Sequence, residues 1–141
     1  MRVVLDTNIW IAGLLWRGKP WQLLRFAEKQ QIQLCISHQM LLELAEVLGY
    51  SQFQQRLHNL NLNANELTAF ALSISLPVDV SREPIPIVDA DPDDDIFLLC
   101  AVAAQAVYVV SNDHHLLNMK NYKGIKIVRI DDFLKEEFGI E

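Results

Sequence analysis

The sequence is poor in basic residues, with 12 Lys and Arg against 18 Asp and Glu and a formal net charge of −6 at pH 7. A field of this sign repels a polyanion such as nucleic acid. Any nucleic acid must therefore be held locally, by a metal ion or a basic patch. The basic residues available for a patch are Arg17, Lys19, Lys120, Lys123 and Lys126, for which ordinary solvated charge is the simpler interpretation.

Cysteines are scarce, and long apolar runs are absent. Cys35 and Cys100 are the two cysteines, and each lies in an apolar run, which favours buried thiols over metal ligands or a disulfide. The chain meets Asp6 after three apolar residues, so it lacks the apolar core of a signal peptide, and no apolar run approaches a membrane span. We expect a cytoplasmic protein without a membrane segment.

Several catalytic motifs are also missing. The chain contains no G-x-G-x-x-G, no G-x-x-x-x-G-K-[ST] and no G-x-S-x-G, which argues against dinucleotide-binding, P-loop and serine-hydrolase proteins. Its 141 residues, 51% of them hydrophobic, suit one compact domain over residues 1–141.

Short apolar strands alternate with helical segments along the chain. Strands are predicted at 2–5, 33–36, 107–110 and 125–130, and helices after each of them. The pattern stays helical from Ser51 to Leu76, where Pro77 is expected to end it, and extended chain follows to Asp89 with at most a short strand at 87–88. This alternation predicts an α/β fold with three layers, α/β/α, around a mainly parallel sheet.

Acidic residues stand at positions where such a fold places ligands. Asp6 and Asp113 directly follow apolar strands, and ligands collect at the carboxyl ends of parallel strands. Glu43 lies on a polar stripe of its helix, which by pattern alone indicates a solvated face. Five acids lie between positions 89 and 95; helix capping explains most of them, whereas Asp95 borders a wholly apolar helix.

Gathered carboxylates raise one another's pKa values, and a divalent ion removes that penalty. Mg²⁺ or Mn²⁺ held in this way can activate a water and stabilise the oxygens of a phosphodiester.

The four histidines show no H-x-x-x-H spacing, and the adjacent rings of His114 and His115 are not expected to converge on one zinc ion. We interpret the histidines as surface or structural residues, or as contacts to substrate.

Three segments in order resemble the PIN-domain nucleases, most closely a branch of toxin components related to the VapC ribonucleases: VVLDTNIWIAGLL, SHQMLLELAEVL and DPDDDIFLLCAVAAQAVYVVSNDHHLL. The resemblance implies a PIN fold and a metal-dependent endoribonuclease that hydrolyses RNA with Mg²⁺ or Mn²⁺. It also implies a small antitoxin protein and a homodimer as partners. The catalytic and metal-binding residues that it implies are Asp6, Glu43, Asp95 and Asp113, supported by Asn8 and Ser111.

Two features leave details of this assignment open. Relatives often carry G-D-x-D-L-L where this chain has His115 in place of the second acid, which leaves one or two metal ions possible. Asp94 lies beside Asp95, and the apolar run directly after Asp95 favours Asp95 as the third ligand.

Three other functions are compatible with parts of the sequence. A catalytically degenerate PIN scaffold could bind RNA or a protein without cutting. A haloacid-dehalogenase-like phosphatase needs a second Asp where Asn8 stands. A phosphoacceptor receiver domain needs an acidic pair at the first strand end, which supplies Asp6 alone.

Overall fold

A central sheet of six strands organises residues 1–81 and 95–141, the part of the chain that this computed structural model describes. The strands lie in the order β3-β2-β1-β4-β6-β5, and every neighbouring pair is parallel except β5 and β6. They are β1 (Arg2–Leu5), β2 (Gln33–Ser37), β3 (Ser75–Val78), β4 (Tyr108–Val110), β5 (Asn121–Tyr122) and β6 (Ile125–Val128). The predicted, mainly parallel sheet is confirmed.

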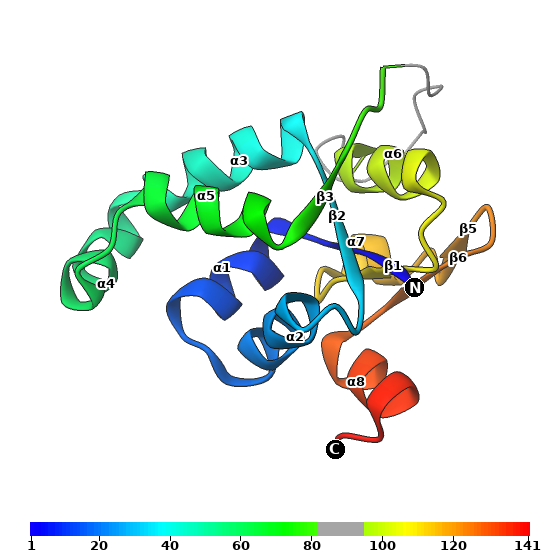
Figure 1. The fold of residues 1–141 in the computed structure, drawn as a ribbon. Coiled ribbons are helices and arrows are strands. Elements are labelled where there is room, and N and C mark those ends of the chain that lie inside the picture. The colour runs from blue at the N-terminus through cyan, green and yellow to red at the C-terminus, as the bar shows by residue number, and fades with distance from the viewer. Residues whose placement is uncertain (82–94) are drawn as a thin grey trace.

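Helices connect these strands and cover both faces of the sheet. Within the described ranges they are α1 (Thr7–Leu15), α2 (Gly18–Glu28), α3 (His38–Leu48), α4 (Ser51–Leu60), α5 (Ala64–Ser73), α6 (Asp95–Ala104), α7 (His114–Leu117) and α8 (Ile130–Phe138). Figure 1 shows α6 on one side of the central strands and α1, α2 and α8 on the other. The three-layer α/β/α prediction is therefore correct. Within the described ranges, none of these helices has both the length and the apolar surface needed to cross a membrane.

Local capping signals set the helix ends that matter for the site. The Ser37 hydroxyl accepts a hydrogen bond from the Met40 N–H at 3.3 Å, so α3 begins directly after β2, and it ends at Gly49 as predicted. Asn63 caps α5 by accepting from the Glu66 N–H at 2.8 Å, and its amide donates to the Glu66 carboxylate at 2.7 Å.

Two strands depart from the sequence prediction. The helical pattern does not reach Leu76, because α5 ends at Ser73 and β3 follows, pairing with β2 in parallel. Pro77 lies inside β3 and does not end a helix; β3 is an edge strand, where one missing N–H is tolerated. The two-residue strand β5 was also not predicted. The expected strand at 87–88 lies outside the described residues.

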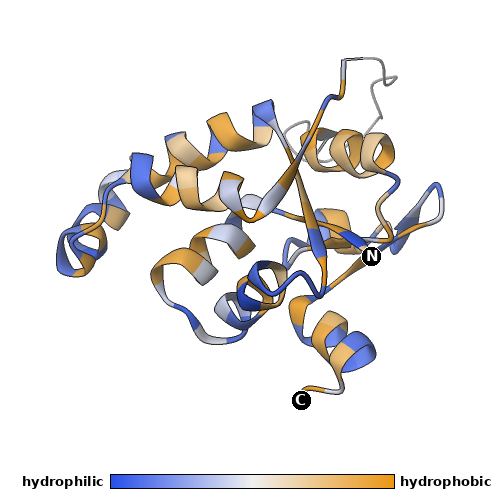
Figure 2. Ribbon diagram, viewed as in Figure 1, coloured by the Kyte–Doolittle hydropathy of each residue, from blue (hydrophilic) through white to orange (hydrophobic). Residues whose placement is uncertain are grey.

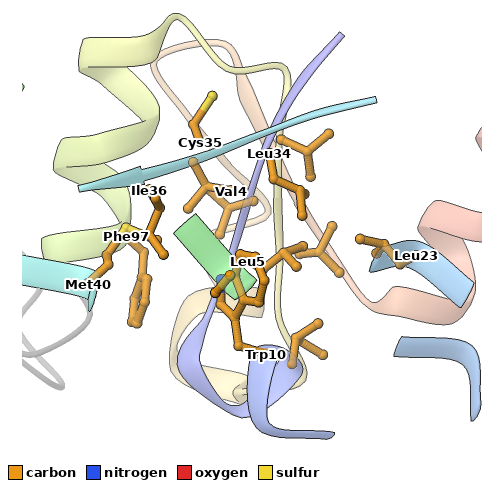
Figure 3. Packing of buried hydrophobic residues seen from close by; sticks show 14 of the residues in the cluster. Val4, Leu5, Trp10, Leu23, Leu34, Cys35, Ile36, Met40 and Phe97 are labelled. Atoms are coloured by element: carbon orange, nitrogen blue, oxygen red, sulfur yellow. The ribbon is translucent and has the colours of Figure 1, made fainter. Parts of the chain in front are cut away.

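The hydrophobic core fills the space on both sides of β1 and β2. In Figure 3, side chains from these strands and from the surrounding helices form one buried cluster. Figure 2 shows that α6 is hydrophobic along its length, as its sequence predicts. Cys35 and Cys100 are free and fully buried in this core, which confirms the prediction of buried thiols, and burial raises the pKa of the Cys100 thiol to about 12.

Candidate metal centre

Asp6 and Ser111 meet where two neighbouring strands end. The parallel register pairs Leu5 with Val110, so the next residue of each strand lies at the same edge of the sheet. The Asp6 N–H donates to the Val110 carbonyl at 3.1 Å, and the Ser111 hydroxyl donates to Asp6 Oδ2. Both side chains are buried, with 4% of Asp6 and none of Ser111 exposed. Sequence order alone thus placed Asp6 correctly at a strand end.

The Asp6 carboxylate is a buried acid whose charge is only partly compensated. Its Oδ1 accepts from the Ile9 N–H at 2.9 Å and so caps α1. Burial, with a smaller contribution from the negative charges of Asp113 and Glu43, raises the pKa of Asp6 from 3.8 to about 6. The two bonds that lower it come from neutral donors, Ser111 and the Ile9 backbone. A cation at this point would stabilise the ionised form.

Asp113 is joined to Asp6 through the same serine. Its backbone N–H donates to Ser111 Oγ at 2.9 Å, while Ser111 donates to Asp6. Asp113 Oδ1 accepts from the His115 N–H at 2.8 Å, which makes Asp113 the N-cap of α7. Ser111 therefore bridges the two acidic residues.

Glu43 faces Thr7 at the start of α1. The Thr7 hydroxyl donates to Glu43 Oε2, and Thr7 is 8% exposed while Glu43 is half-buried. The solvated face indicated by the helical pattern alone is therefore wrong for Glu43. Its charge also acts on the pKa of Asp6. Thr7 is a functional candidate that sequence reasoning missed, although it directly follows Asp6 in the D-T-N segment.

The structure describes the remaining predicted residues less fully. Asp95 is the first residue of α6, the helix that packs against β1 and β2, and its side chain lies outside what is described. Asp94 also lies outside the described residues. The role of Asp95 and the choice of Asp95 over Asp94 as the third ligand therefore stay predictions. Asn8 is exposed on the first turn of α1, and its predicted support of Asp6 also stays a prediction.

The five basic residues considered for a patch lie in two groups. Arg17 stacks over the Trp21 ring at 5.1 Å, and Lys19 pairs with Asp131 at 3.1 Å, both at the start of α2. Exposed lysines at 120, 123 and 126 surround the β5–β6 hairpin. Arg17, Lys120 and Lys123 have backbone φ values of 65°, 62° and 48°, which cost free energy for residues with a Cβ.

Comparison with known proteins identifies the family. A family model described as PIN domain matches residues 2–115. The solved structure of VapBC2 from Rickettsia felis, bound to a DNA fragment from its promoter, matches with a TM-score of 0.60 and 17% identity, covering 90% of this chain and 97% of that chain. At this identity the likeness concerns the fold. No curated protein sequence gives a significant match.

Proposed function

Because this chain belongs to the PIN domain family, we propose that it is a divalent-metal-dependent endoribonuclease with Asp6, Glu43, Asp95 and Asp113 as metal ligands. One observation carries the proposal: Ser111 bridges Asp6 and Asp113, and the charges of Glu43 and Asp113 both raise the pKa of the buried Asp6. Three predicted ligands from distant parts of the sequence are thus electrostatically coupled.

The donor set fits a hard divalent cation. Mg²⁺ and Mn²⁺ prefer carboxylate oxygens, and the carboxylates of Asp6, Glu43 and Asp113 supply them. When bound, such an ion can activate a water and neutralise charge on the reacting phosphodiester.

The protein's own part is to orient the acids before a cation arrives. The Ile9 N–H and the Ser111 hydroxyl fix the two oxygens of Asp6. Thr7 holds Glu43, and the His115 N–H holds Asp113. Fixed ligands of this kind reduce the entropy lost on binding a cation and substrate.

RNA is the substrate class that the resemblance favours, and the net charge of −6 makes local binding necessary. A cation among the acids would attract the scissile phosphate. Arg17 and the lysines of the β5–β6 hairpin are candidates to contact neighbouring phosphates.

A toxin in a toxin–antitoxin pair is the biological role that we propose. The motif resemblance is closest to that branch, and the matching structure from Rickettsia felis is a VapBC2 complex. We therefore propose a small antitoxin as partner, a homodimer and a cytoplasmic location. Expression alone should arrest growth, and co-expression with a small protein encoded next to the gene should restore it and yield a stable complex.

The main test compares cleavage of a mixed RNA pool by the wild type and by Asp6→Asn, with Mn²⁺, with Mg²⁺ and with a chelator. Asp132→Asn, an exposed acid of α8, is the matched control. We expect cleavage by the wild type and the control with metal present, and loss of at least about 100-fold in Asp6→Asn, the scale on which catalytic groups act. Equal activity in Asp6→Asn would refute the assignment.

The principal alternative is a degenerate PIN scaffold, motivated by His115 in place of an acid. Calorimetry that finds no Mg²⁺ or Mn²⁺ binding, together with retained RNA binding, would favour it. The PIN family match argues against both the phosphatase and the receiver domain.

A further inference from the structure

Asp113, His114 and His115 form a cluster of possible metal ligands at the start of α7. Each offers one ligand atom, and these three atoms lie within 4.8 Å of one another. The two imidazole rings have centroids 4.2 Å apart and are tilted by 37°. The two adjacent rings therefore lie closer together than the sequence spacing led us to expect.

The backbone holds the Asp113 side of this cluster in place. Neighbouring residues inside a helix point about 100° apart, because there are about 3.6 residues per turn. Asp113, however, is the cap and not a helical residue, and its carboxylate folds over to accept from the His115 N–H at 2.8 Å. The bond from the Asp113 N–H to Ser111 Oγ, 2.9 Å long, anchors the same turn to the buried end of β4. One side of the cluster is thus held in place.

The three ligand atoms need to move only a short way to bind one zinc ion. Ligand atoms about 2.0–2.2 Å from a tetrahedral zinc ion lie about 3.4 Å from each other. The separations of up to 4.8 Å must shorten by little more than 1 Å. His114 is exposed and His115 half-buried, so both rings can rotate that far.

The chemistry of the donors selects the class of ion. Imidazole nitrogens suit Zn²⁺ and its neighbours in the transition series, whereas Mg²⁺ prefers oxygen. We propose that Asp113, His114 and His115 form a binding site for Zn²⁺, with water in the fourth position. This ligand set is distinct from the four acids, although the two sets share Asp113.

Sharing Asp113 has a regulatory consequence, which rests on the proposed nuclease function. A Zn²⁺ ion on the cluster would compete for the Asp113 carboxylate with the acidic centre, where this group is a proposed ligand for Mg²⁺ or Mn²⁺. Zinc would then inhibit the nuclease.

The binding test is calorimetry of the whole protein with Zn²⁺, supported by the visible absorption of Co²⁺ as a probe of nitrogen ligation. The variants are His114→Ala and His115→Ala, and His58→Ala on α4 is the matched control. We expect one Zn²⁺ per chain in the wild type and control. Zn²⁺ affinity should fall at least about 10-fold in His114→Ala and in His115→Ala, since losing even a group that only orients a metal ligand lowers metal affinity about 10- to 100-fold. Circular dichroism checks that all variants are folded. Equal Zn²⁺ affinity in all four proteins would overturn the proposal.

Asp6→Asn separates this proposal from the nuclease assignment. Zinc should still bind to Asp6→Asn, because Asp6 is outside the cluster. If zinc binding depends on Asp6 and not on His114 or His115, the ion belongs to the acidic centre and the proposal is wrong.

Inhibition is tested in the Mn²⁺-driven cleavage reaction. We expect Zn²⁺ to inhibit the wild type and the His58→Ala control at concentrations about 10-fold or more below those needed for His115→Ala. Failure of every protein to cleave RNA would refute the nuclease and leave the zinc-binding result standing. Cleavage that zinc does not inhibit, despite measured zinc binding, would refute the regulatory consequence alone.

Discussion

The hydroxyl of Ser111 donates a hydrogen bond to the carboxylate of Asp6, which lies 105 positions earlier in the chain. The same hydroxyl oxygen accepts the N–H of Asp113 at 2.9 Å. One buried atom therefore fixes the relative positions of two proposed metal ligands. The parallel pairing of β1 with β4 produces this arrangement, because it brings both strand ends to one edge of the sheet.

Ser111→Ala is predicted to loosen this pair. Both acids remain, but Asp6 loses a bond that lowers its pKa, and Asp113 loses the partner of its N–H. Mn²⁺ affinity measured by calorimetry should fall about 10- to 100-fold, as for other groups that orient metal ligands. The control is Ser73→Ala, which removes an exposed hydroxyl that bonds to the Phe70 carbonyl. An unchanged affinity in Ser111→Ala would show that the bridge does not orient the acids.

Asp6→Asn is predicted to stabilise the metal-free protein above pH 6. The pKa of Asp6 is raised from 3.8 to about 6 in the folded chain, so between these values the folded state binds more protons than the unfolded state. The contribution of Asp6 to wild-type stability must then fall as the pH rises from about 4 to about 6. Two pKa units correspond to a cost of at most about 3 kcal/mol above pH 6. Urea unfolding in a chelator at pH 4 and pH 8 measures the difference.

The expected result is a larger stability advantage of Asp6→Asn at pH 8 than at pH 4. Asp132→Asn, at an exposed position, should not show this larger advantage at pH 8. Added Mn²⁺ should raise the melting temperature of the wild type at pH 8 more than that of Asp6→Asn. A constant advantage across pH would mean that Asp6 is not destabilised by its surroundings.

Thr7→Val tests the link between α1 and α3. The side chains have similar shape, but valine cannot donate to Glu43, so the glutamate loses the bond that holds it. We expect Mn²⁺ affinity to fall about 10-fold and unfolding free energy by about 1 kcal/mol. Thr7→Ser keeps the hydroxyl and should retain most of the metal affinity. Unchanged Mn²⁺ affinity in Thr7→Val would show that the hydroxyl bond does not orient Glu43.

The sequence predicted those parts of the fold that depend on local signals. The helix after β2 could be read from Ser37 as its cap and Gly49 at its end, and both are found there. β3 could not be predicted in this way, because a proline such as Pro77 argues against a strand unless that strand lies at the edge of a sheet. The edge position of β3 follows only from its pairing with β2.

The same division applies to the site. Asp6 and Asp113 follow apolar strands, so strand prediction located them. Glu43 is oriented by Thr7, 36 positions away, and helical periodicity contains no information about such a contact. Glu43 was proposed as a metal ligand from the family motif and not from the helical pattern. The closeness of the His114 and His115 rings was not predicted, because it depends on side-chain conformations that sequence spacing does not determine.

Arg17→Gly should separate RNA binding from stability. Arg17 has φ 65° and ψ −125°, which glycine adopts freely, so the substitution relieves about 1–3 kcal/mol of strain. It also removes a cation–π contact with Trp21, about 0.5–1 kcal/mol, so urea unfolding should show no loss of stability. In an Asp6→Asn background, RNA affinity should fall and depend less steeply on salt. Arg25→Gly, inside α2 and also near Trp21, should instead cost about 1 kcal/mol. Unchanged RNA affinity in Arg17→Gly would remove Arg17 from the proposed RNA contacts.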